Sequence, residues 1–399
     1  MLGRETRDAV ARLAAAVLSV RPLVEELAAP VRVTPGTRTG TGPCAWPPGR
    51  RMALRRLLER VARGTGVPVV LAPKDDPRLL GLFERVVSDR LALADWADTV
   101  VPADLLGEVD DVVAGAVAAG FDTTANKRTL PSPDGTPLNI YSAGEGPEAV
   151  VLVPACGMPA ALAEPWIRYL AADRRVLTWE SRGLFGAHGS PGDYRWDLDA
   201  QVDDLFAVLD HHGVKRAHAV GLCGGAVIAL AAAAEHPERI MSLSLWHGAY
   251  GFAADDYPTT SHQAGLIELM TAAARDRAAA RAVHAAFCQA VLTSTSADVA
   301  HLVLHPYASP ELLYRYCRLN TGITGTDVEP LLPRVPQPTL VVTSKDDDIA
   351  APLGSKRVAG GLPNGQLLVE EHGDHISVFN ADDLLLSKAE RFMSRHPGR

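Results

Sequence analysis

The chain has 399 residues, of which 47% are hydrophobic and 22% charged, and its net charge is −8. This composition suits a globular protein with a sizeable core, and the acidic balance argues against nucleic acid as a partner. No apolar run approaches the roughly 20 residues that a membrane span needs. The N-terminal apolar residues follow a helical spacing and do not resemble a signal peptide. We therefore expect a cytoplasmic protein that does not insert into a membrane.

Cysteine usage bears on redox state and metal binding. The five cysteines are an odd number at irregular spacing, and no paired CxxC pattern occurs among them: Cys44, Cys156, Cys223, Cys288 and Cys317. This favours reduced thiols over a disulfide framework or a structural zinc site. We expect neither a metal nor an organic cofactor.

The first 125 residues predict a mostly helical N-terminal extension without a chemical motif. In chain order we expect a helix over 1–29, a Pro- and Gly-rich loop or linker over 30–50, a helix over 51–64, a short strand within 67–73 and broken helix over 76–119. The extension could cover an edge of the main domain, form part of a substrate channel, or make a homodimer. The sequence does not choose between these roles.

Strands and helices then alternate along the chain. An Asp-Gly turn predicts a hairpin near 134–144. After it we expect strands within 148–155, 175–179, 217–222, 241–248, 338–344 and 365–373, and helices within 162–172, 197–213, 225–240 and 381–395. This alternation predicts an α/β core with a mostly parallel sheet and helices on both faces, formed by residues 126–254 and 331–399.

A helical segment interrupts this alternation between the sixth and seventh strands. Residues 255–330 carry Ala-rich helical patterns and no strand pattern. An insertion there lies over the carboxyl ends of the strands, where open α/β sheets bind ligands. We expect it to form a cap or lid over a site.

The pattern Gly221-Leu222-Cys223-Gly224-Gly225 lies between a predicted strand and a predicted helix. A nucleophile on such a turn points away from the sheet, and the flanking glycines remove side-chain clashes. The next amide, that of Gly224, then faces the same space and can donate to an oxyanion. Taken alone, Cys223 could equally be a small buried thiol in a tight turn.

Two later segments supply the partners that a nucleophile needs. "SKDDDIAAP" follows the next-to-last strand and "EEHGDHISVF" follows the last. The order nucleophile, acid, histidine, together with the loop "TWESRG", resembles the α/β-hydrolase superfamily over residues 129–399. That resemblance implies Cys223 as nucleophile, His375 as general base, with His372 as the fallback, and Asp347 as acid. The run of three acids leaves Asp346 and Asp348 as alternatives.

The same resemblance implies the rest of the site. The second oxyanion donor is expected in "PACGMPA", where one alignment selects the amide of Met158, which we prefer, and the other selects that of Cys156. Glu180 replaces the family's usual Asp in its loop and is expected, with Arg182, to brace it. Further residues expected around the substrate pocket are Cys156, Gly157, Leu222 and His247.

A cysteine nucleophile favours chemistry on an ester or thioester, because a thiolate attacks both well and forms a reactive acyl thioester. We expect acyl cleavage or transfer on a small acyl or polyketide-like substrate. "ACGMPA" with "LTWESRG" resembles a group of α/β-hydrolase-like proteins of polyketide and tetronate biosynthesis. Two alternatives stay open: a lyase that eliminates an acyloxy group such as acetate, and a pocket receptor without catalysis.

Overall fold

The computed structural model describes residues 1–27, 29–35, 47–96, 101–102, 105–185, 194–253, 259–293 and 295–398. Cys44 lies outside the described residues. The chain forms two compact units, one of residues 1–124 with 291–308 and one of residues 125–290 with 309–399. Part of the segment predicted as a cap therefore belongs to the first unit. No described helix has a stretch long and apolar enough to cross a bilayer.

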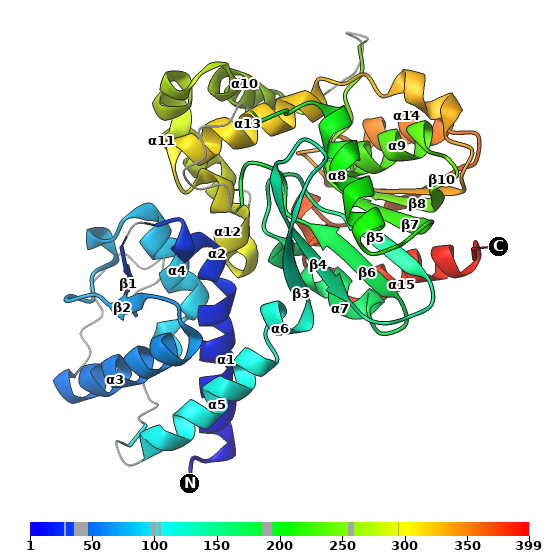
Figure 1. The fold of residues 1–399 in the computed structure, drawn as a ribbon. Helices are drawn as coiled ribbons and strands as arrows, with labels where there is room; N and C mark the ends of the chain where they lie inside the picture. The colour runs from blue at the N-terminus through cyan, green and yellow to red at the C-terminus, as the bar shows by residue number, and fades with distance from the viewer. Residues whose placement is uncertain are drawn as a thin grey trace. The chain divides into compact units, whose positions relative to one another are not determined.

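The first unit is mainly helical, and most of its helices come from the N-terminal part of the chain (Figure 1). Helix α1 buries Val10, Leu13 and Val17 along one face, as its apolar spacing predicts. The segment predicted as a loop or linker differs in its first residues, because Val31–Val33 pair in parallel with Val69–Leu71. The elements are α1 (Arg4–Ser19), α2 (Arg21–Glu25), β1 (Val31–Val33), α3 (Pro48–Thr65), β2 (Val69–Leu71), η1 (Pro77–Leu79), α4 (Leu82–Leu91), η2 (Leu93–Trp96), α5 (Leu106–Ala118), α6 (Phe121–Thr124), α12 (Ala297–Val303) and η5 (His305–Tyr307).

The second unit contains an eight-stranded sheet in the order β10-β9-β8-β7-β5-β6-β4-β3. The predicted hairpin is the antiparallel pair β3–β4 at one edge, and β4 is also antiparallel to β6, whereas the other neighbours are parallel. The strands are β3 (Asn126–Pro131), β4 (Pro137–Ala143), β5 (Ala149–Val153), β6 (Arg175–Trp179), β7 (Ala217–Leu222), β8 (Ile240–Trp246), β9 (Thr339–Ser344) and β10 (Gly365–Glu370).

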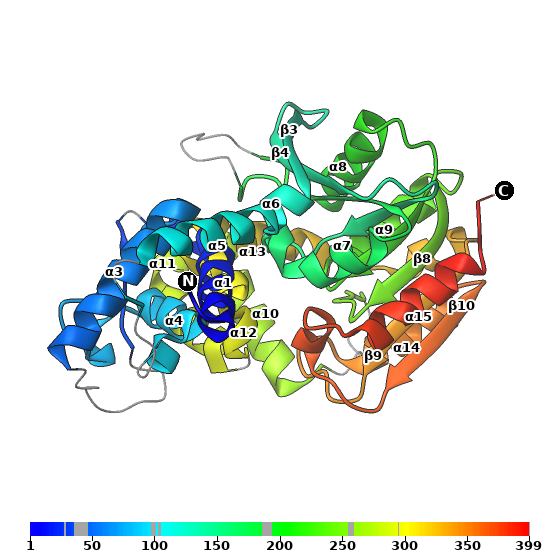
Figure 2. The ribbon, with the colours of Figure 1, turned by 90° about the horizontal axis from the view of Figure 1, so that it is seen from below.

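Helices cover both faces of this sheet. Helices α8, α9 and α14 lie on one face, and α7 and α15 lie on the other (Figures 1 and 2). Strands β5 and β7 are buried along their whole length, which explains their continuous apolar runs. These elements are η4 (Ala160–Ala163), α7 (Glu164–Leu170), α8 (Leu198–His211), α9 (Gly225–Glu235), α14 (Pro352–Gly361), η7 (His375–Val378) and α15 (Asp383–Ser394).

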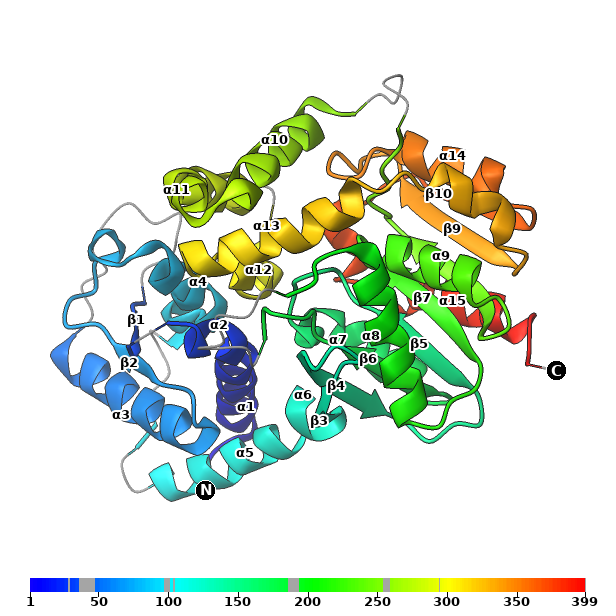
Figure 3. The ribbon, with the colours of Figure 1, turned by 45° about the horizontal axis from the view of Figure 1, so that its top comes forward.

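Two of the helices between β8 and β9, α10 and α13, contact loops that follow the strands. Helix α10 runs beside α13 (Figure 3). Arg315 on α13 donates to the carbonyl of Gly183 at 3.0 Å, so α13 is fastened to the loop after β6. The elements of this segment are α10 (Ser261–Arg275), α11 (Arg277–Thr293), α13 (Pro310–Thr324) and η6 (Glu329–Arg334).

Candidate active site

Cys223 lies on a strained turn between β7 and α9. Its φ is +53°, in the left-handed region that residues with a Cβ rarely adopt. Its amide donates to the carbonyl of Trp246 at 2.9 Å, which ties the turn to β8. The side chain is half-buried and stands at the N-terminal end of α9, whose dipole favours a negative charge.

The glycines around Cys223 are required by close backbone contacts. A Cβ at Gly221 would lie 2.6 Å from the Cα of Ala226. A Cβ at Gly225 would lie 2.4 Å from the carbonyl oxygen of Val153. Both contacts are shorter than van der Waals distance and involve backbone that cannot move freely. The turn therefore requires glycine two residues before and two residues after Cys223, as predicted from the Gly-x-Cys-x-Gly pattern.

Three residues from distant parts of the sequence form a hydrogen-bonded chain at the sheet's carboxyl edge. The Nε2 of His375 lies 3.1 Å from the Sγ of Cys223, and its Nδ1 lies 3.0 Å from the Oδ2 of Asp347. Both His375 and Asp347 are buried. The arrangement has the order and contacts of a nucleophile, a base and an orienting acid.

Burial and charge act against each other in this chain. Burial alone would lower the pKa of His375, but the adjacent Asp347 carboxylate and Cys223 side chain outweigh it and raise the pKa well above its usual value. Burial would likewise raise the pKa of Asp347, but His375 and its hydrogen bonds lower it. The geometry thus favours an ionised carboxylate beside an imidazolium.

The structure distinguishes the neighbouring residues that the sequence left as alternatives. Asp346 is exposed and lies 3.5 Å from the ring of His372, whose side chain is 92% exposed. Asp348 is also exposed. Only Asp347 of the three acids is buried, and its Oδ1 accepts the amides of Ile349 and Ala350 at 3.0 and 2.8 Å.

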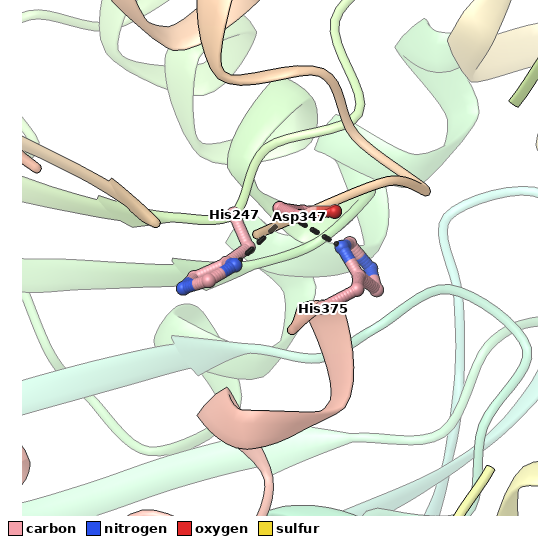
Figure 4. A group of neighbouring side chains, drawn as sticks. All are labelled: His247, Asp347 and His375. Atoms are coloured by element: carbon pink, nitrogen blue, oxygen red, sulfur yellow. Dashed lines mark hydrogen bonds and ion pairs between the residues drawn. The ribbon is translucent and has the colours of Figure 1, made fainter. Parts of the chain in front are cut away.

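A second histidine contacts the same carboxylate (Figure 4). The Nδ1 of His247 lies 2.9 Å from the Oδ2 of Asp347, and its ring meets that of His375 edge-on at 6.0 Å. The sequence predicted His247 around the substrate pocket, and in the structure its buried side chain lies against Asp347. Its position directly after a predicted strand, at the same carboxyl edge of the sheet as Asp347, was the signal available in the sequence.

The loop after β5 corrects the expected oxyanion donor. The amide of Met158 donates to the carbonyl of Ala155 at 3.1 Å, so it closes a turn and is not free for a substrate. In contrast, the amides of Cys156 and Gly224 donate no hydrogen bond to another described residue. A Cβ at Gly224 would lie 3.0 Å from the Sγ of Cys156, so the two segments are adjacent. The geometry favours the alternative alignment, with Cys156 beside Gly224.

The loop after β6 supports the loop after β5. Ser181 accepts the amide of Gly157 at 2.8 Å, and Glu180 accepts the amide of Ala160 at 3.2 Å. Glu180 also accepts from the side chain of Asn139 at 2.9 Å. Arg182 instead binds Asp204, so it and Glu180 brace different segments. Ser181, which no sequence motif singled out, therefore supports the loop after β5.

Leu222 and Gly157, two other residues predicted around the substrate pocket, lie in different surroundings: one in the core and one beside helix α13. Leu222 is fully buried within β7, which is a core position and not a pocket wall. A Cβ at Gly157 would lie 2.4 Å from the ring of Tyr316, and one at Gly224 would lie 3.9 Å from the Oδ1 of Asn320. Helix α13 therefore brings Tyr316 and Asn320 next to Gly157 and the Cys223 turn.

One group among the described residues could hold a metal ion: His247, Asp347 and His375. Both histidine contacts to Asp347 are already hydrogen-bonding distances, and the second carboxylate oxygen accepts two amides. The hydrogen bonds of the carboxylate are therefore complete without a metal ion.

Comparisons with known proteins agree with this architecture. The family described as "alpha/beta hydrolase fold" matches residues 148–382, from β5 past His375. The putative carbamate hydrolase RutD of Stutzerimonas stutzeri is 28% identical over 252 residues, covering 58% of this chain and 86% of that protein. The corresponding protein of Agrobacterium fabrum is 24% identical over 233 residues, covering 57% and 86%.

Solved structures share the fold at low sequence identity. The enol-lactonase from Burkholderia xenovorans LB400 superposes with a TM-score of 0.54 at 21% identity, covering 67% of this chain and all (100%) of that one. A thermophilic esterase from Thermogutta terrifontis gives a TM-score of 0.55 at 19% identity, covering 68% and 100%. With the family match spanning more than half of its residues, this chain belongs to the alpha/beta hydrolase fold family.

Proposed function

We propose that this chain is an enzyme that cleaves or transfers acyl groups through a cysteine nucleophile. The observation that carries the proposal is the 3.1 Å contact between the Nε2 of His375 and the Sγ of Cys223. In this role Cys223 attacks the acyl carbonyl, His375 moves the proton, and Asp347 orients His375. A buried thiol without function would need neither the strained φ nor the ordered partners.

In the proposed attack, Cys223 passes its proton to His375 and acts as a thiolate beside an imidazolium. The raised pKa of His375 favours this state, since the imidazolium is held between Asp347 and Cys223. The N-terminus of α9 adds a partial positive charge at Cys223. A thiolate is the nucleophilic form of cysteine, and His375, whose Nε2 lies 3.1 Å from the Sγ, is placed to hold the proton during attack.

The proposed reaction proceeds through an acyl-enzyme. The thiolate forms a C–S bond to the carbonyl carbon, and the carbonyl oxygen takes the negative charge. The tetrahedral intermediate collapses, the bond to the leaving group breaks, and His375 donates its Nε2 proton to that group. Water or another acceptor then gives a proton to His375 and attacks the thioester, which releases the acyl product and the Cys223 thiolate.

The negative oxygen of the intermediate needs two N–H donors. We propose the amides of Gly224 and Cys156, which lie on adjacent segments and donate to no other described residue. Each such donor is worth about 3–4 kcal/mol to the transition state in enzymes of this kind. A charged oxygen placed there would also meet the amide end of α9.

The proposed substrate class is an activated acyl compound. The curated relatives include proteins named putative carbamate hydrolases, and the structural neighbours include an enol-lactonase and an esterase. The compounds in these names (carbamates, enol-lactones and esters) each contain a carbonyl attached to a leaving group. The resemblance of the two loops to proteins of polyketide biosynthesis adds acetylated polyketide intermediates to the candidates.

Trapping the acyl-enzyme tests the proposal. The protein is mixed with p-nitrophenyl acetate, an acetyl thioester or an aryl carbamate and quenched in acid, and its intact mass is measured. We expect one added acyl group, mapped to the peptide of Cys223 and absent from Cys223→Ala. The matched control Cys288→Ala, which removes a thiol buried on α11, should keep the adduct. No adduct from any of the three reagents would contradict the proposal.

Product analysis separates hydrolysis from acyloxy elimination. When an acetylated substrate reacts in ¹⁸O-labelled water, hydrolysis through an acyl-enzyme places labelled oxygen in the acetate. An alkene with unlabelled acetate would identify a lyase that uses His375 or Cys223 as a base, and would overturn the acyl-transfer mechanism. Full biological function of Cys223→Ala would instead identify a receptor.

A further inference from the structure

The histidine after β8 lies beside the acid after β9 because these strands are neighbours. Trp246 pairs with Val342 in the parallel register, and the amide of His247 donates to the carbonyl of Val342 at 2.9 Å. Each strand then ends in a turn that brings one side chain to the sheet edge. His247 and Asp347 therefore meet because they follow the ends of two paired strands, His247 directly after Trp246 and Asp347 three residues after Ser344.

The backbone of His247 is held in an uncommon conformation. Its φ is +48°, and among the described residues only Ala92 and Cys223 share a positive φ without being glycine. Such a conformation costs roughly 1–2 kcal/mol. Two of these three residues thus belong to the hydrogen-bonded chain that includes Asp347. Retained strain at a buried polar contact points to a functional reason for the turn.

The hydrogen-bond inventory of Asp347 assigns a proton to each histidine. An ionised carboxylate only accepts, so the Nδ1 of His247 and the Nδ1 of His375 must both carry hydrogen. With the two amides on Oδ1, four donors point at one carboxylate that is fully shielded from water. Without His247, Oδ2 would keep a single donor and Asp347 would lose a restraint on its side-chain rotation.

We propose that His247 is a positioning residue, whose Nδ1–H holds the Oδ2 of Asp347 in the place where it orients His375 toward Cys223. The inference rests on the proposed function, since it concerns the rate at which Cys223 accepts an acyl group. Small displacements of catalytic groups lower rates strongly, by about 100-fold for 1 Å. His247 acts through Asp347 and does not touch the reacting atoms.

Two substitutions separate the hydrogen bond from the bulk of the ring. His247→Phe keeps a planar ring but has no donor, whereas His247→Asn places an amide N–H at the position of the histidine Nδ1. We expect the rate of Cys223 acylation by p-nitrophenyl acetate in a single turnover to fall about 10- to 100-fold in His247→Phe. In His247→Asn we expect a rate within about threefold of the wild-type rate, because the donor is restored.

The matched control replaces another buried histidine. His218 on β7 is fully buried and bonds Ser242 on β8 at 2.8 Å, and it has no place in the proposed mechanism. His218→Phe should keep the wild-type acylation rate. Equal rates in wild type and in His247→Phe would overturn the inference and leave the proposed function intact. Failure of the wild type to acylate would instead overturn the proposed function.

A measurement on the wild-type protein keeps the inference testable if His247→Phe does not fold. In protein with nitrogen-labelled histidine, the Nδ1–H groups of His247 and His375 should both give slowly exchanging ring-proton signals in NMR spectra. The absence of a protonated Nδ1 on His247 would contradict the proposal. So would a metal ion, identified by elemental analysis, that replaces both ring protons in the purified protein.

Discussion

At the scale of single residues, the turn around Cys223 depends on the absence of side chains. Gly221 and Gly225 lie against backbone atoms, whereas Gly224 lies against the Sγ of Cys156. Gly225 is the most restrictive, because a Cβ there would be 2.4 Å from the carbonyl of Val153 and 2.5 Å from that of Pro154. These carbonyls lead into the loop that carries the proposed Cys156 donor.

Replacing Gly225 by alanine should therefore damage both stability and the site. We expect Gly225→Ala to lose about 1–3 kcal/mol of unfolding free energy, the usual cost of forcing extra atoms into packed structure. Acylation of Cys223 should also slow, because the loop after β5 must move. Urea unfolding and acylation kinetics measure the two effects. The control is Gly360→Ala on α14, where the new methyl meets nothing within 4 Å. If Gly360→Ala lost as much unfolding free energy as Gly225→Ala, the explanation would be contradicted.

At the scale of elements, Arg182 joins the loop after β6 to two other segments. Its guanidinium binds both oxygens of Asp204 on α8 at 2.8 and 2.6 Å, and Asp134 of the β3–β4 turn at 2.5 Å. The Arg182 and Asp204 side chains are each only 1% exposed. This pair orients the loop that carries Ser181, which in turn holds the amide of Gly157.

Removing the arginine should be costly, because it leaves a buried carboxylate without its partner. We expect Arg182→Met to lose about 3–5 kcal/mol of unfolding free energy. Arg195→Met, which breaks an exposed pair with Asp197, should cost at most about 1 kcal/mol. Chemical denaturation of both variants tests the difference. The double variant Arg182→Met with Asp204→Leu should recover part of the loss, and no recovery would argue against the buried charge as its cause.

At the scale of the whole molecule, the chain crosses between its two units three times, after residues 124, 290 and 308. Helix α12 packs against α2 and α4 within the first unit. Within α12, His301 is 1% exposed, and neither ring nitrogen has a hydrogen-bond partner among the described residues. Burial, with a smaller effect of the Arg90 charge, lowers the pKa of His301 to about 3.

This histidine should make stability fall in mild acid. It is neutral in the folded protein but takes up a proton on unfolding once the pH drops below about 6.5. Between pH 7 and pH 5 we expect it to remove about 2 kcal/mol of unfolding free energy. His301→Leu should lack that loss, as seen by denaturant unfolding at both pH values. The control His372→Leu, at a side chain 92% exposed, should leave the pH dependence unchanged.

Much of the core fold could be predicted because its signals are local. Buried parallel strands need continuous apolar runs, and the turn at Cys223 needs glycine, so both appear in the sequence itself. Asp347 could be preferred over its two neighbours only through a family pattern. The short strand Val31–Val33 was missed because three residues beside a Pro- and Gly-rich segment carry too little periodicity.

The sequence by itself determined the order of the elements, the glycines of the turn, and the chain order of Cys223, Asp347 and His375. Only the tertiary structure decided that Met158 closes a turn, that Cys156 lies beside Gly224, and that His247 shares a carboxylate with His375. It also decided that residues 291–308 fold with the N-terminal unit. The physical reason is that these outcomes depend on hydrogen bonds and packing between segments distant in the chain, which local periodicity does not encode.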